Sequence, residues 1–120
     1  SPEIVYMKNM YVTLYAREGR IITITSDEGS YNKTTYDCFF KNNVKATDGE
    51  TVILSENLDL LSTVESATAY NDVILTNENG SLQADKVDYN FETKYYKISM
   101  YNNKKVKVKL IQWVTLKNLE

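Results

Sequence analysis

The sequence contains no histidine, one cysteine, one proline and four glycines among its 120 residues. Without histidine, the chain lacks the commonest general base and the commonest metal ligand of proteins. The single cysteine, Cys38, excludes an intramolecular disulfide and any cysteine-rich zinc site. We therefore expect a protein that is not an enzyme and that holds no metal or cofactor.

Neither sign of charge dominates, and long hydrophobic runs are missing. The net charge is −2, from 14 basic and 16 acidic residues, which argues against nucleic acid as a partner. No apolar stretch approaches the ~18 residues that span a bilayer, and the first residues show no signal-peptide pattern. What is abundant is tyrosine, with ten residues. Tyrosine favours strands over helices, and the length suits one domain over residues 1–120.

Glycine-bearing turns divide the chain at regular intervals. Glu18-Gly19, Asp48-Gly49 and Asn79-Gly80 each lie between two strand-like runs, and the three glycines are 30 and 31 residues apart. Such dipeptides are strong hairpin signals because their residues tolerate positive φ. The sequence therefore predicts three hairpins with a nearly constant period. Asn102-Asn103 suggests a fourth, glycine-free turn between the strand-like runs 95–101 and 104–111.

Two further landmarks repeat with an offset of 29 residues. Asn43-Val44 matches Asp72-Val73, and Leu58-Asp59-Leu60 matches Val87-Asp88-Tyr89. One such unit cannot bury its own apolar face, so stacked units must share a core. We predict an all-β fold, an open twisted β-jellyroll (β-taco) built from stacked hairpin repeats. The only helix-tolerant stretch, Glu56–Ala69, lies inside the repeat and is predicted to be strand plus loop.

Alternating apolar and polar residues predict which side chains point inward. Val12, Leu14 and Ala16 share one face with Ile22 and Ile24. Applied along the chain, the alternation predicts an apolar interior made of Ile22, Ile24, Tyr36, Cys38, Phe40, Val44, Val52, Leu54, Leu60, Val73, Leu75, Leu82, Ala84, Ile98, Met100, Val106 and Val108.

The turn and strand segments also resemble a known family, the OstA-like proteins of lipopolysaccharide export. The resemblance extends from about Val5 to Leu110. It is carried by Asp27–Asn32, by Phe39–Val44 with Asp48-Gly49, and by Asn71–Val73 through Asn79-Gly80 to Ala84–Tyr89. The opening segment, Met7–Ser26, is most similar to the periplasmic domain of the inner-membrane C component (LptC). The soluble A component (LptA) is the second choice.

The resemblance implies a periplasmic relay for lipopolysaccharide. Such a protein accepts lipopolysaccharide from an inner-membrane ABC transporter and passes it to the next β-jellyroll of a transenvelope bridge. Its edge strands dock with homologous β-jellyrolls. The resemblance further implies a protein anchored in the inner membrane of a Gram-negative bacterium, with a transmembrane anchor ahead of residue 1.

If the ligand is a lipid, the apolar interior is the predicted lipid-binding surface, although the same residues could simply form a core. Lys105, Lys107 and Lys109 alternate on the last strand. They are either contacts for lipid phosphates or a solvated strand face that guards an edge. Cys38 is expected to be a small buried hydrophobe and not a reactive thiol.

An alternative of another class stays open at this point. The chain could be a structural or adhesive β-repeat module that binds protein or carbohydrate on its tyrosine-bearing outer faces. The two hypotheses differ in the interior of the fold. A lipid carrier needs an open groove, whereas an adhesive module is expected to have a closed, dry core.

Overall fold

The computed structural model describes residues 3–93, 95–100 and 107–110, and strands dominate them. The strands are β1 (Ile4–Tyr15), β2 (Ile21–Asn32), β3 (Cys38–Asp48), β4 (Thr51–Leu61), β5 (Ser66–Asn77), β6 (Gly80–Asn90), β7 (Tyr96–Ser99) and β8 (Lys107–Leu110). Two short 3₁₀ segments are η1 (Arg17–Gly19) and η2 (Ser62–Val64). The predicted all-β jellyroll is confirmed, and Glu56–Ala69 is strand and loop as expected.

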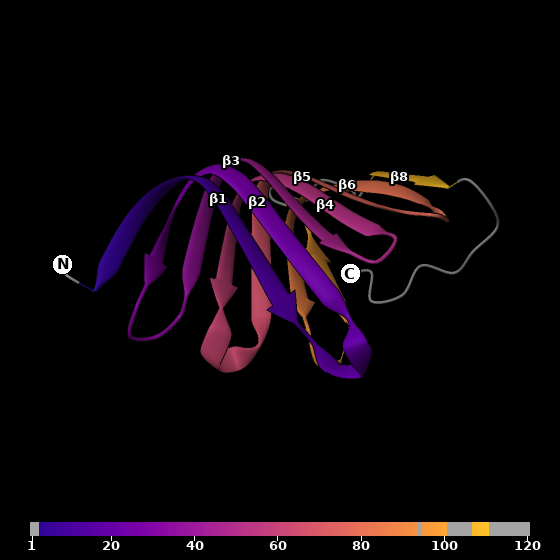
Figure 1. Ribbon diagram of the computed structural model, residues 1–120. Helices are drawn as coiled ribbons and strands as arrows, with labels where there is room; N and C mark the ends of the chain where they lie inside the picture. The colour runs from indigo at the N-terminus through magenta and orange to yellow at the C-terminus, as the bar shows by residue number, and fades with distance from the viewer. Residues whose placement is uncertain (1–2, 94, 101–106, 111–120) are drawn as a thin grey trace.

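Within the described residues, the eight strands form one antiparallel sheet. Strands β1 to β7 lie side by side in the order in which they follow one another along the chain, and β8 pairs with β6. The long strands arch over a common ridge, so that the sheet descends on two sides (Figure 1). We call this ridge the fold line. The half of the sheet that ends in the glycine turns is the glycine-turn wall, and the other half is the opposite wall.

The fold line lies where the strand pairing is interrupted. The register shifts between Thr25 and Glu28 in β2, and the neighbouring strands shift at the matching place. In β3 and β5 the residues at this place have left-handed backbone: φ is 66° at Asn42, 52° at Asn43, 66° at Asn71 and 57° at Asp72. Asn and Asp adopt this conformation more readily than other residues with a Cβ. The two landmarks, Asn or Asp before Val, thus mark the points where a strand leaves one wall for the other.

Side chains along the fold line repeat with the same offset. Asn42 Nδ2 donates to Glu28 Oε2 at 2.8 Å, and Asn71 Nδ2 donates to Asn57 Oδ1 at 2.8 Å. Donors and acceptors are each 29 residues apart. The repeat predicted from the sequence is therefore confirmed, and its unit is one bent strand pair.

Asp72 allows a clean test of the backbone at the fold line, because its side chain is exposed. We expect Asp72→Gly to leave the free energy of unfolding nearly unchanged. We expect Asp72→Val to lower it by about 1–2 kcal/mol, because a β-branched residue is strained at positive φ. Urea unfolding of the two variants measures the difference. Equal stabilities would contradict a left-handed backbone at this position.

The fold line also changes which residues point inward, and this makes part of the interior prediction wrong. In β4 the buried residues are Ile53 and Ser55 on one wall but Leu58 and Leu60 on the other. At the fold line the alternation of β4 shifts by one residue, as expected where strand pairing is interrupted. Leu54, predicted to point inward, is therefore 42% exposed. Val52, also predicted inward, is only half-buried.

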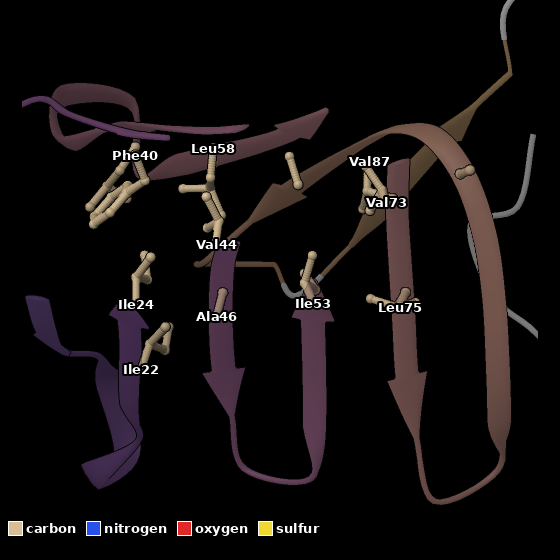
Figure 2. Close-up of a cluster of buried hydrophobic side chains, with 14 of the residues drawn as sticks. Ile22, Ile24, Phe40, Val44, Ala46, Ile53, Leu58, Val73, Leu75 and Val87 are labelled. Carbon is tan, nitrogen blue, oxygen red and sulfur yellow. The ribbon is translucent and has the colours of Figure 1, made fainter. Parts of the chain in front are cut away.

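Most of the predicted interior is confirmed as a buried apolar core between the two walls (Figure 2). Buried as predicted are Ile22, Ile24, Cys38, Phe40, Val44, Leu60, Val73, Leu75, Leu82, Ala84 and Ile98, and Met100 packs against them. The alternation missed Met10, Ala46, Ile53, Leu58, Ala67, Ala69, Val87 and Tyr89. Val106 lies outside the described residues, and Val108 is described only by its backbone pairing with Leu82.

The three glycine turns connect β1 to β2, β3 to β4 and β5 to β6, as predicted. The turns at the other end of the hairpins contain no glycine, and the sequence patterns did not reveal them. Two of them are built on an asparagine: Asn32 Oδ1 accepts the backbone N–H groups of two following residues, and so does Asn90 Oδ1. These are Asx turns, whose signal in the sequence is weaker than that of Asn-Gly.

The fourth predicted turn, Asn102-Asn103, lies outside the described residues. Among the described residues, the strands on either side of it are not paired with each other. Instead, β7 pairs with one half of β6 and β8 pairs with the other half. Together they occupy the place of a seventh long strand, divided at the fold line.

Candidate functional site

The interior contains an open cavity at the β1 end of the sheet, which we call the β1 cavity. Its volume is about 480 Å³, within the range of small-molecule sites. The inner face of β1 forms one side of it through Met10, Val12 and Leu14, and Cys38 and Leu60 come from the opposite wall. The cavity reaches the surface, because exposed tyrosines also line it: Tyr11, Tyr15 and Tyr36.

The region between the walls formed by β2 to β6 is filled by the described side chains. The remaining space there is only about 20 Å³. Ile24, Ala46, Leu58, Ala69 and Val87 are among the side chains that fill this region. The structure thus combines the two interiors that the sequence left open: a filled core along most of the sheet and an open cavity beneath β1.

A polar cluster joins the two walls at their free margins. Arg20 and Asp48 belong to the glycine-turn wall, and Arg20 Nε lies 3.1 Å from Asp48 Oδ1 in an ion pair without hydrogen-bond geometry. Tyr89 comes from the opposite wall, and its hydroxyl donates to Asp48 Oδ2 at 2.8 Å. Arg20 Nη2 donates to the Phe91 carbonyl oxygen at 3.1 Å and to the Tyr89 hydroxyl at 3.3 Å. These contacts tie the margins together across the mouth of the jellyroll.

The aromatic rings of the cluster are packed against one another. Tyr89 and Phe91 meet edge to face, with ring centroids 5.4 Å apart, and Tyr89 and Tyr96 lie 4.9 Å apart. Burial raises the pKa of the Tyr89 hydroxyl above its ordinary value of 10, and the hydrogen bond to Asp48 raises it further. Burial also raises the pKa of Tyr96. The hydroxyl groups of Tyr89 and Tyr96 therefore stay protonated, and so neutral, well into the alkaline range.

The raised pKa of Tyr89 predicts that the protein loses stability in alkali. Below pH 10 the hydroxyl is protonated in both the folded and unfolded states. Above that pH the unfolded state releases the proton first, so Tyr89 lowers stability by up to about 1.4 kcal/mol per pH unit. We expect Tyr89→Phe to flatten the decline of urea stability above pH 10. The exposed Tyr95→Phe is the control and should keep the wild-type slope, and equal slopes for the two variants would refute the effect.

Apart from Val52, Leu54, Met100, Val106 and Val108, whose positions are given above, the predicted site residues fall into three groups. Ile22, Tyr36, Cys38 and Leu60 line the β1 cavity. Buried in the core but outside this cavity are Ile24, Phe40, Val44, Val73, Leu75, Leu82, Ala84 and Ile98. Lys105 lies outside the described residues, and Lys107 and Lys109 are described only as backbone in β8. Contact of any of these residues with lipid, or of the lysines with phosphate, stays a prediction.

At the cavity, Tyr36 differs from its predicted role, and Phe91 was not predicted at all. Tyr36 does not lie on a strand face, because it belongs to the β2–β3 connection with φ of 65° and is 61% exposed. Phe91 lies in the β6–β7 connection and was missed, since a loop residue has no alternation to reveal it. Cys38 is buried as expected. Burial, and then the neighbouring Asp37, raises the pKa of its thiol and makes it a poor nucleophile.

Comparisons with known proteins agree with this architecture. The family model described as lipopolysaccharide-assembly, LptC-related, matches residues 2–109. Among solved structures, the fold is similar to that of LptH from Pseudomonas aeruginosa, described as the LptA-homologous periplasmic component of its lipopolysaccharide transport device. The TM-score is 0.62 at 7% identity, over 92% of this chain and 95% of that one, which supports the fold alone. No curated protein sequence matches the chain.

The family match covers both walls of the jellyroll, the fold line and the β1 cavity. It confirms the resemblance to the lipopolysaccharide-export proteins that the turn and strand segments suggested. No helix within residues 3–93, 95–100 and 107–110 is long and apolar enough to cross a membrane. The chain belongs to the LptC-related family of lipopolysaccharide-assembly proteins.

Proposed function

We propose that the chain binds the acyl chains of lipopolysaccharide in the β1 cavity and relays the lipid between neighbouring proteins in the periplasm. It accepts lipopolysaccharide from an inner-membrane ABC transporter while held at that membrane, and passes it to the next β-jellyroll. The observation that carries the proposal is the β1 cavity, a mainly apolar space of about 480 Å³ that is open to solvent. Membership of the LptC-related family supports lipopolysaccharide as the lipid.

The chemistry of the cavity suits an acyl chain. Met10, Val12, Leu14, Ile22 and Leu60 line it with apolar side chains. Each methylene that leaves water contributes about 0.8 kcal/mol, so several buried methylenes give several kcal/mol of gross binding energy. Such binding needs no hydrogen bond to the tail. The acyl chain can also leave the cavity one methylene at a time, as release to the next protein requires.

The ends of the sheet suit transfer from one protein to the next. β1 pairs only with β2 among the described strands, and no described strand occupies its other edge. At the opposite end, β7 and β8 lie beyond β6. An open edge can add a strand from a partner through main-chain hydrogen bonds. Docking at the β1 edge would bring a neighbouring jellyroll next to the cavity.

Photo-crosslinking in cells that make lipopolysaccharide tests the proposal. A photoreactive phenylalanine analogue replaces Tyr36, which lines the β1 cavity and is 61% exposed. We expect crosslinks to lipopolysaccharide from this position. Tyr95 is the matched control, because it is 59% exposed but lies outside the cavity.

Two results would overturn the proposal. One is that Tyr36 crosslinks only to protein. The other is that Tyr95 crosslinks to lipid as efficiently as Tyr36, because the lipid contact would then not depend on the cavity. Phe40 and Val73 are less suitable positions for the probe, since each is only 1% exposed in the closed core.

A further inference from the structure

Phe91 stands at the boundary between the two parts of the interior. Its side chain lines the β1 cavity of about 480 Å³ on one side and the closed region of about 20 Å³ on the other. Of the other residues described at these two sites, only Ile22 also lines both. Ile22 lies within β2, whereas Phe91 lies in the connection after β6. The open space thus ends at Ile22 of the glycine-turn wall and at Phe91 of the connection after β6.

Phe91 is held in this position from two directions. Its carbonyl oxygen accepts from Arg20 Nη2 at 3.1 Å, which ties its backbone to the glycine-turn wall. Its ring packs edge to face on Tyr89 at 5.4 Å, with an interplanar angle of 79°. Tyr89 in turn is buried and bonded to Asp48. The ring is therefore a fixed partition and not a loose side chain.

We infer that Phe91 limits how far an apolar chain reaches into the jellyroll, and so sets the chain-length preference of the β1 cavity. This inference rests on the proposed function, because it requires that the cavity binds alkyl chains. Arg20 acts as a positioning residue, since it bonds the Phe91 backbone and does not line the cavity. A residue of the β6–β7 connection thereby limits the length of the alkyl chain that the cavity holds.

The inference predicts a break in the dependence of affinity on chain length. While an added methylene still enters the cavity, affinity rises by about fourfold per methylene. Once the chain end meets Phe91, further methylenes remain in water and affinity levels off. Phe91→Ala removes about six carbon atoms from the partition, so the plateau should begin several methylenes later. Phe91→Trp enlarges the partition, so the plateau should begin at a shorter chain.

The experiment uses purified protein and saturated fatty acids from octanoic to octadecanoic acid. Each acid, kept below its micelle-forming concentration, displaces a fluorescent fatty acid from the protein. Affinities for wild type, Phe91→Ala and Phe91→Trp are compared as a function of chain length. We expect the break to move to longer chains in Phe91→Ala and to shorter chains in Phe91→Trp.

Leu58→Ala is the matched control, because Leu58 lines the closed region but not the β1 cavity. It should leave the break where wild type has it. A break that stays in place in both Phe91 variants, or that moves equally in Leu58→Ala, overturns the inference while leaving the proposed function intact. If the wild-type protein does not bind the probe, or if no acid of any chain length displaces the probe from it, the proposed function itself fails. Should Phe91→Ala not fold, as judged by circular dichroism, Phe91→Leu replaces it and Phe91→Trp still tests the opposite direction.

Discussion

Replacing Arg20 by alanine is expected to lower the free energy of unfolding by about 3 kcal/mol. The side chains of Arg20 and Asp48 are only 19% and 18% exposed, so the carboxylate left behind would be a largely buried charge without its counter-ion. The variant also removes the donor to the Phe91 carbonyl oxygen and with it a link between the two walls. Leaving this partly buried acceptor without its donor adds to the cost. Urea unfolding at neutral pH, with the slope checked for two-state behaviour, measures the loss.

The Lys86–Asp88 ion pair provides the matched control within the same chain. Its atoms are 3.6 Å apart, and its side chains are 39% and 35% exposed. Solvent screens such a pair, so Lys86→Ala should cost no more than about 0.5 kcal/mol. In the double variant Arg20→Ala with Asp48→Ala, the loss should be smaller than the sum of the two single losses, because neither charge is then left alone. Equal costs for Arg20→Ala and Lys86→Ala would refute a structural role for the cluster.

Gly29→Ala is expected to cost about 2–3 kcal/mol, although it adds only one methyl group. An added Cβ would contact Met10 Sδ and would lie 2.6 Å from the Phe39 carbonyl oxygen. The thioether of Met10 can rotate away, but the carbonyl belongs to the neighbouring strand β3 and cannot move without disturbing the sheet. Thermal and urea unfolding of the variant measure the loss.

Gly19→Ala is the control for Gly29→Ala, because it measures the cost of replacing a glycine where the new methyl group meets no other atom. At Gly19 no atom lies within 4 Å of an added Cβ, so only the strain of φ at +72° remains. That strain is worth about 1 kcal/mol. We therefore expect Gly29→Ala to be the more damaging of the two. If the order is reversed, the close approach of β3 and Met10 to Gly29 does not limit stability.

Gly29 also shows how the repeat is adapted at its beginning. The positions 29 and 58 residues later are Leu58 and Val87, which are buried in the core. In the first unit the glycine leaves this place without a side chain. Met10 of β1 fills the place instead, because its Sδ lies where a Cβ on Gly29 would project. The first strand thereby closes the core at the fold line, while farther along it the β1 cavity stays open.

Local chemistry explains why much of this fold is predictable. Glu18-Gly19, Asp48-Gly49 and Asn79-Gly80 specify turns through their own backbone preferences, whatever surrounds them. Alternation works for the same reason, because successive side chains of any strand point to opposite faces. Both signals act over a few residues, and the 29-residue period follows from repeating them.

The errors in the predicted interior arise at the fold line, where the simple alternation of inward and outward side chains is interrupted. An alternation that continues unbroken through β4 places Val52 and Leu54 inside. At the fold line, however, the inward-facing positions of β4 shift by one residue. A register shift becomes visible only when the pairing partner is known, since it is a mismatch between two strands. The sequence signal of the bend is Asn42-Asn43 in β3 and Asn71-Asp72 in β5. In the sequence alone, these residues cannot be told from other polar residues of a strand.

By itself, the sequence determined that this chain is a non-helical stack of hairpins with one apolar face, and its motifs pointed to lipopolysaccharide export. Only the tertiary structure decided where that apolar face is filled and where it is open. Arg20 and Phe91 are 71 residues apart, and neither belongs to an alternating pattern. Whether inward side chains meet or leave a space depends on how closely two walls approach, and that distance is set by contacts between residues far apart in the chain.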